Sequence, residues 1–202
     1  MMKLYYSAGA CSLAPHIVAK EANLALTLER VDLGAHKTTD GTDFYSINPK
    51  GSVPFLLLDS GEYLSEGPII CQYLADVAGN TSLAPAAGTM ARYRVMEWQN
   101  YITSELHKSF SPLFNPASSA DTKAEFAAGL SKKYAWVSEQ LAGKNYLTGD
   151  TFTIADAYLF VVTNWTKYVG VDISAYAPLQ QFLQRVASRP AVLAALKDEG
   201  LI

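Results

Sequence analysis

The hydrophobic pattern of the chain changes near residue 80, and this change limits the folds that the chain can adopt. The first part alternates short β-rich runs with helical runs, whereas the later part has helical periodicity and no convincing strand. Between them, GNTSLAPAAGT is rich in Gly, Pro, Ser and Thr, as linkers are. The pattern predicts an α/β domain at 1–81, a linker at 82–88 and an all-helical domain at 89–202.

The N-terminal part predicts the element order β-α-β, a long connection, and then β-β-α. The expected strands are 3–7, 26–33, 53–59 and 62–65, and the expected helices are 12–23 and 67–78. This order resembles a thioredoxin-like half-domain. The helices expected in the second part are 89–111, 122–142, 153–169, 176–188 and 190–197.

The composition is that of an ordinary globular protein, and it argues against several classes. Of the 202 residues, 50% are hydrophobic and 17% are charged, and the formal net charge is −3. No basic run is present, so we expect no nucleic-acid partner. The longest mostly apolar run, AYLFVVT, is far too short to span a bilayer, and the N-terminus has no signal-peptide pattern. With only two cysteines, these features predict a cytoplasmic protein without a membrane partner.

Cys11 stands between the short SAGA loop and an expected helix, where a thiol can be activated. Ser12 is a good N-cap residue, and Pro15 is acceptable in the first turn. Backbone N–H groups and the helix dipole at such a position favour an anion, which would lower the pKa of the thiol. A buried, inert cysteine is the alternative. Ala14 stands where a C-x-x-C motif would have its second cysteine, which excludes a dithiol pair there, and Cys71 is expected in the core.

Two short motifs, NPKGSVP and SEGP, have features of a ligand site. Pro54 opens a strand, and a cis bond before it would turn the backbone of Val53 toward an extended peptide. Bare N–H groups at the start of the next helix suit a carboxylate, and Glu66 suits an ammonium, so the end of an α-amino acid would be matched. A plain loop, and ordinary capping by Ser65 and Glu66, are the simpler alternatives.

A polar face recurs at helical spacing in the run VMEWQNYITSELHKSF. Its members are Asn100, Ser104, His107 and Ser111. It lies away from an apolar stripe that contains Val95, Trp98, Ile102 and Leu106. A solvated face is the commoner explanation for such a pattern, and a cleft-lining face is the alternative.

The remaining motifs give no second site. His16 lies five residues past Cys11, about 140° around an ideal helix, and is poorly placed as its base. No set of His, Cys and carboxylate residues has metal-ligand spacing, so no metal is expected. The capping box TIAD, from Thr153 to Asp156, predicts the start of a core helix.

Together, the motifs make the chain resemble a glutathione transferase of the bacterial beta class. The segments that carry the resemblance are KLYYSAGACSLAPHIV, NPKGSVP, SEGPIICQYLAD, EWQNYITSELHKSFSPLF and FTIADAYLF. The resemblance implies the cytosolic glutathione transferase fold, with a thioredoxin-like domain followed by an all-helical domain, and a homodimer. It also implies that glutathione binds as co-substrate in the cleft between the domains, beside a small hydrophobic electrophile.

The resemblance implies a role in glutathione binding for residues of both domains. They are Cys11, Ser12, His36, Lys37, Val53, Pro54, Glu66, Gly67, Asn100, Ser104 and His107. The backbone of Val53 would bond to the cysteinyl part, and Glu66 and Gly67 would hold the γ-glutamyl end. Asn100 could serve the site of the neighbouring subunit.

Cys11 and His107 are the catalytic residues that the resemblance implies. Cys11 would face the glutathione sulfur and can form a mixed disulfide with it in this class, with Ser12 beside the thiolate. His36 stands where the class often has a lysine for the glycine carboxylate. Because histidine is neutral much of the time at neutral pH, that contact could pass to Lys37.

The expected activity is a transferase reaction of alkyl or aryl groups, in which glutathione is conjugated to hydrophobic electrophiles for detoxification. One alternative is a glutathione-dependent thiol/disulfide reductase or reductive dehalogenase with Cys11 as covalent nucleophile. Another is a protein that binds hydrophobic compounds without catalysis. Free glutathione is mostly a thiol at neutral pH, so the first reaction needs a site that lowers the pKa of this thiol.

Overall fold

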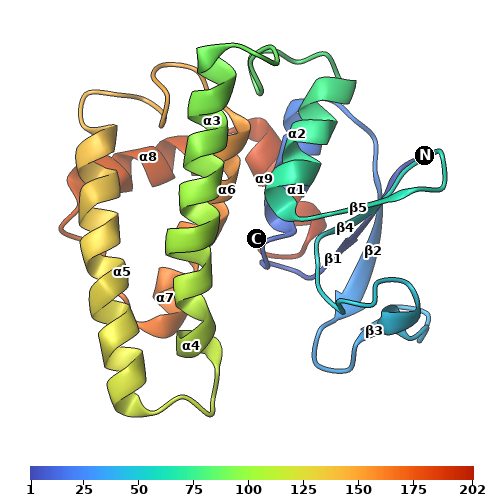
Figure 1. The fold of residues 1–202 in the computed structure, drawn as a ribbon, viewed down its shortest axis with the longest axis horizontal. Helices are drawn as coiled ribbons and strands as arrows, with labels where there is room; N and C mark the ends of the chain where they lie inside the picture. Colours follow the sequence, from blue (N-terminus) through green and yellow to red (C-terminus); the bar gives the residue numbers. More distant parts are fainter. The chain divides into compact units, whose positions relative to one another are not determined.

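The computed structural model describes residues 1–202, which group by their contacts into two compact units. The first unit contains Met1–Ala84 and Arg189–Ile202, and the second contains Pro85–Ser188. The first unit holds the whole sheet with its helices, and the second is built from helices (Figure 1). The predicted α/β plus all-α organisation, with a thioredoxin-like N-terminal part, is confirmed.

The first unit is built on a 5-stranded mixed sheet with the strand order β3-β2-β1-β4-β5. Its strands are β1 (Lys3–Tyr6), β2 (Thr27–Asp32), β3 (Lys37–Thr38), β4 (Phe55–Leu57) and β5 (Tyr63–Ser65). β1 and β2 are parallel and are joined through helix α1 (Leu13–Glu21), while the other neighbours are antiparallel. The crossover leads the chain from β1 through the turn that carries Cys11.

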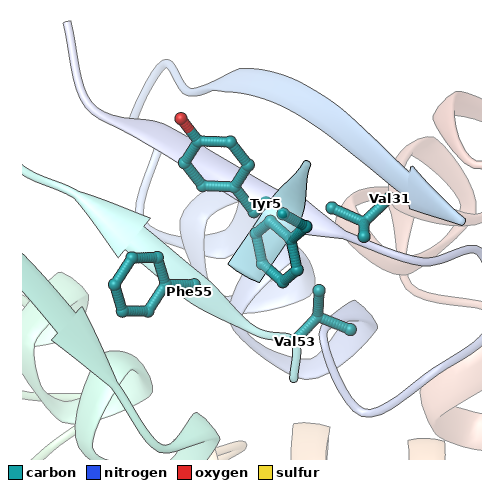
Figure 2. Packing of buried hydrophobic residues seen from close by; sticks show 5 residues of the cluster. Tyr5, Val31, Val53 and Phe55 are labelled. Carbon is teal, nitrogen blue, oxygen red and sulfur yellow. The ribbon is translucent and has the colours of Figure 1, made fainter. Parts of the chain in front are cut away.

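Side chains of the central strands alternate between the two faces of the sheet. Leu4 pairs with Leu56, and Tyr5 pairs with Phe55, so the members of each pair share a face. On the Tyr5 face, a buried cluster forms from Tyr5, Val31, Phe44, Val53 and Phe55 (Figure 2). Because Val53 belongs to this cluster, the core fixes the backbone at the end of the NPKGSVP loop.

The first unit has three α-helices, α1, α2 (Gly67–Val77) and α9 (Pro190–Asp198), and the short 3₁₀-helix η1 (Phe44–Ser46). α1 packs against both α2 and α9 (Figure 1). Arg189 ties the last segment to α1, because its guanidinium donates to both carboxylate oxygens of Glu21 at 2.6 and 2.8 Å. The end of the chain therefore packs with the first unit, whereas the sequence places it in the helical domain; the domain boundaries themselves stay a prediction.

The second unit contains the other helical segments. They are α3 (Met90–Tyr101), the π-helix η2 (Ile102–Leu106), the 3₁₀-helix η3 (His107–Phe110), α4 (Ser111–Phe114), α5 (Ala120–Leu141), α6 (Ile154–Asn164), α7 (Thr166–Val169) and α8 (Ala177–Ala187). The run 89–111 is helical from Met90 on, as predicted, but the helix type changes after Tyr101. None of the helices is both long and apolar enough to cross a membrane.

α6 forms the core of the second unit, and it starts at the predicted capping box. Every residue from Ile154 to Thr163 is buried. The carboxylate of Asp156 accepts hydrogen bonds from the N–H and the hydroxyl of Thr153, each at 2.8 Å. Its other oxygen accepts the N–H of Leu147 at 2.8 Å. Asp156 therefore joins the start of α6 to the preceding loop.

Candidate functional site

Cys11 lies in the turn between β1 and α1, beside the backbone of Val53. Its Sγ donates a hydrogen bond to the carbonyl oxygen of Val53 at 3.2 Å. Burial raises the pKa of the Cys11 thiol to about 12, although the backbone N–H groups of Cys11 and Ser12 act in the opposite direction. The expectation of a lowered pKa is therefore wrong, because desolvation outweighs the effect of the helix start. Cys11 is a neutral thiol at neutral pH.

The alkylation rate of Cys11 should reveal this raised pKa. Because only the thiolate reacts, we expect slow reaction with iodoacetamide at neutral pH and a rise of about tenfold per pH unit up to about pH 10. Cys71 is fully buried and burial also raises its pKa, so it should stay unmodified and serves as the internal control. Mass spectrometry of the two cysteine peptides measures both rates. A rate that levels off below about pH 9 would contradict the assignment.

Ser12 is buried and does not cap α1, contrary to the prediction. Its backbone is already helical, with φ −61° and ψ −19°, and its side chain makes no capping bond. Instead, its hydroxyl accepts the N–H of Ser7 at 3.1 Å and donates to the carbonyl of Ser7 at 3.2 Å. Ser12 therefore closes the loop that carries Cys11.

Glu199 also holds the loop before Cys11, and sequence reasoning missed it. Its Oε2 accepts the N–H of Gly9 at 2.9 Å, and its Oε1 lies 3.0 Å from Nδ1 of His16. The side chains of Glu199 and His16 are almost fully buried. His16 therefore interacts with the end of α9. No local motif marks this pair, because 183 residues separate its members.

Four of the predicted residues lie close together in the first unit. They are Val53 and Pro54, just before β4, and Glu66 and Gly67, at the start of α2. The Val53–Pro54 peptide bond is cis, as the sequence predicts. A Cβ added to Gly67 would lie 3.5 Å from the ring of Pro54. Glu66 occupies the N-cap position of α2 with φ +70° and makes no side-chain capping bond, so the alternative of ordinary capping is wrong. Its carboxylate is exposed beside the start of the helix.

Lys50 is a second residue that sequence reasoning missed. Its Nζ lies 2.9 Å from Oε1 of Glu66 and donates to the Ser65 hydroxyl at 3.0 Å. The side chains of Lys50 and Glu66 are 58% and 64% exposed, so this ion pair contributes little to stability. The carboxylate of Glu66 can therefore exchange Lys50 for another cation at low cost.

His36 and Lys37 differ in how much of the side chain contacts other protein atoms. Nε2 of His36 lies 3.2 Å from the hydroxyl of Tyr45, and its Nδ1 is buried without a hydrogen-bond partner. A Cβ on Gly51, which has φ +61°, would lie 2.4 Å from the Tyr45 ring, so only glycine fits under this pair. Lys37 is exposed on β3.

The other three predicted glutathione residues lie in the second unit, around the change of helix type. Asn100 and Ser104 are exposed, and the Ser104 hydroxyl donates to the carbonyl of Asn100 at 3.1 Å. Nδ1 of His107 lies 2.6 Å from the hydroxyl of Tyr158, and the His107 ring meets Trp165 edge-on with centroids 4.8 Å apart. Sequence reasoning missed Tyr158, because it lies in the apolar run of α6.

The side chains of the structure form no cluster that suits a metal ion. Residues 1–202 contain no group of three or more His, Cys, Asp or Glu side chains placed to hold a metal ion.

A cavity of about 560 Å³ lies in the second unit, and its lining includes Trp98, Tyr101 and Trp136. None of the predicted glutathione residues lines this cavity.

Two family models match the chain. The model described as the glutathione S-transferase N-terminal domain matches residues 8–77, and the model for the C-terminal domain matches residues 101–190. The chain is 45% identical over 200 residues to glutathione S-transferase GstA of Escherichia coli O157:H7, which covers 99% of this chain and 100% of that protein.

Solved structures show the same similarity in three dimensions. A sphingomonad glutathione S-transferase in complex with glutathione has a TM-score of 0.95 and 46% identity, covering 99% of this chain and 100% of that one. The bacterial beta-class glutathione S-transferase of Sphingomonas chungbukensis has a TM-score of 0.95 and 44% identity, with the same coverage. The similarity therefore extends over both units.

Proposed function

Because the chain belongs to the glutathione S-transferase family and resembles its bacterial beta class, we propose that it conjugates glutathione to small hydrophobic electrophiles. The observation that carries this proposal is the full-length similarity to a sphingomonad transferase solved with glutathione. Glutathione is the co-substrate of this family. The class of electrophile is the proposed part, together with the roles of individual residues.

In the proposed reaction, the glutathione thiol loses its proton to solvent and its sulfur attacks an electrophilic carbon. With a chlorinated nitrobenzene, a carbon–sulfur bond forms, the carbon–chlorine bond breaks, and chloride leaves. The raised pKa of Cys11 supports glutathione as the nucleophile, because a neutral Cys11 is a poor one. Its S–H, which donates to Val53 in this structure, would instead donate to the glutathione thiolate.

The first unit offers groups of the right charge for the two ends of glutathione. Glu66 would take the ammonium of the γ-glutamyl end in exchange for Lys50, with Gly67 beside it. The backbone of Val53, next to Pro54, would bond to the cysteinyl part. Lys37 is the better candidate for the glycine carboxylate, because both ring nitrogens of His36 face protein atoms.

The second unit would supply the polar groups Asn100, Ser104 and His107. Tyr158 contacts Nδ1 of His107, and the proposed contact of this ring with a sulfur atom is through Nε2. A hydrogen bond from Nε2 would stabilise the thiolate and lower the pKa of glutathione. Each pKa unit corresponds to about 1.4 kcal/mol of differential stabilisation.

Two variants test these roles in an assay with a chlorinated nitrobenzene. We expect Cys11→Ala to keep kcat/KM within about fivefold of wild type, since a hydrogen bond from a weak S–H donor contributes about 1 kcal/mol or less. His107→Ala should lower it about tenfold or more, because a hydrogen bond to a charged group contributes about 1.5 kcal/mol or more. Cys71→Ala, which removes the other thiol, is the matched control for Cys11→Ala.

The alternatives predict different outcomes. Loss of glutathione-dependent disulfide reduction in Cys11→Ala, with a stable glutathione adduct on Cys11 of wild type after exposure to oxidised glutathione, would favour the reductase. Unchanged rates in His107→Ala would remove this histidine from the mechanism. Binding without turnover over a broad electrophile panel would contradict the transferase proposal and favour a storage protein.

We also propose that the chain forms a homodimer and acts in the cytoplasm. Exposed apolar side chains on α2 and α3 support the homodimer, because such side chains often mark interfaces. They include Ile69, Val77, Met90 and Tyr93, which are 47%, 52%, 65% and 53% exposed.

A further inference from the structure

The helix that carries the proposed second-unit residues changes its geometry twice within a few residues. α3 ends at Tyr101, a π-helix covers Ile102–Leu106, and a 3₁₀-helix covers His107–Phe110. A π turn contains about one residue more than an α turn, so it rotates the following side chains relative to an ideal helix. His107 comes directly after this turn. Its direction therefore depends on where the helix breaks.

Lys133, on the neighbouring helix α5, holds the backbone at this break. Its Nζ donates to the carbonyl oxygen of Glu105 at 2.8 Å and to the hydroxyl of Ser109 at 3.1 Å. The Ser109 hydroxyl donates to the same carbonyl at 2.6 Å. Side chains that take carbonyls of the helix ladder as acceptors are a recognised cause of helix bends and breaks. Two such donors meet at one carbonyl here.

For the position of the helix break, the bond from Lys133 to the Glu105 carbonyl matters more than the ion pair between the two side chains. Nζ of Lys133 also lies 3.0 Å from Oε2 of Glu105, but the side chains of Lys133 and Glu105 are 30% and 47% exposed. A partly exposed ion pair contributes little. A charged donor on a backbone carbonyl is a stronger bond, and it acts on the position of the main chain itself.

We propose that Lys133 is a positioning residue for the transferase reaction, because its ammonium fixes the carbonyl of Glu105 and thereby the helix break that directs His107. The break places His107 against Tyr158 and Trp165. This proposal rests on the role proposed for His107. Lys133 acts through the backbone and has no contact with the reacting atoms.

The chain offers a matched control in the adjacent lysine. Lys132 is exposed, and no hydrogen bond or ion pair joins it to the break. We expect Lys133→Met to lower kcat about tenfold when a misplaced His107 no longer reaches the sulfur, whereas Lys132→Met should match wild type. Lys133→Arg, which keeps a charged donor, should restore part of the rate. Glu105→Gln removes the ion pair but keeps the carbonyl contact, and should stay within about twofold of wild type.

The indole signals of the three tryptophans in a ¹⁵N-labelled sample give a readout that does not need catalysis. Because Trp165 packs on His107, its signal should shift in Lys133→Met and stay in place in Lys132→Met. Ser109→Ala removes the other donor and should shift the signal in the same direction, which keeps the test valid if Lys133→Met does not fold.

The outcomes separate this proposal from the proposed function. A wild-type protein without conjugation contradicts the function, and the Trp165 signal then still tests the positioning. A Lys133→Met variant that matches Lys132→Met in kcat and in the Trp165 signal overturns the proposal. A lower melting temperature with unchanged kcat and an unchanged signal also overturns it, because Lys133 then serves stability alone.

Discussion

Replacing Asp156 with alanine is expected to lower the free energy of unfolding by about 4 kcal/mol. The carboxylate is fully buried and accepts hydrogen bonds from the N–H groups of Leu147 and Thr153 and from the Thr153 hydroxyl. Alanine leaves these donors buried without a partner, and each unsatisfied group costs about 1–3 kcal/mol. Since α6 fills the core of the second unit, the loss should affect the whole unit.

Urea unfolding followed by circular dichroism measures this effect. Asp150→Ala is the matched control, because Asp150 is exposed in the same region and accepts a single hydrogen bond, from Asn145 at 2.9 Å. Its loss should cost less than about 1 kcal/mol. A loss below about 1 kcal/mol in Asp156→Ala as well would show that water or a local shift satisfies the freed donors.

The elements that the sequence predicts well are those that carry their own periodic pattern. β1, α1, α2 and α5 each have such a pattern, and the structure places them within a few residues of the predicted bounds. β3 has only two residues, so it has no period to detect, and it exists because it pairs with β2. The π turn after Tyr101 could not be predicted for another reason. Its carbonyl at Glu105 accepts a hydrogen bond from Lys133, which lies on a different helix, α5.

The chemistry of the candidate site depends on tertiary contacts that local rules do not contain. The helix-start argument predicts a lowered pKa for Cys11, but the packing around it removes water and raises the pKa to about 12. Ser12 has the right side chain for a cap, but Ser7 lies close enough to compete for it. Sequence spacing identifies the residue types that a site needs, and burial decides their ionisation.

Replacing Glu199 with alanine is expected to lower the free energy of unfolding by about 3 kcal/mol and to speed the alkylation of Cys11. The Glu199 carboxylate is buried and accepts the N–H of Gly9, while His16 contacts its other oxygen. Without it, the loop before Cys11 loses an anchor, and the buried His16 ring loses the contact of its Nδ1. A looser loop admits water to the thiol, which lowers the pKa of Cys11 toward its ordinary value.

Asp198→Ala is the matched control, because this neighbouring carboxylate is 39% exposed and pairs with Lys20 at the surface. It should cost less than about 1 kcal/mol and leave the alkylation rate unchanged. If Glu199→Ala lowers stability with no change at Cys11, the carboxylate holds α9 alone, and the predicted link to the loop is wrong. If the stability falls and the alkylation rate rises together, Glu199 helps to keep water away from Cys11. The neutral state of this thiol then depends on a residue near the end of the chain.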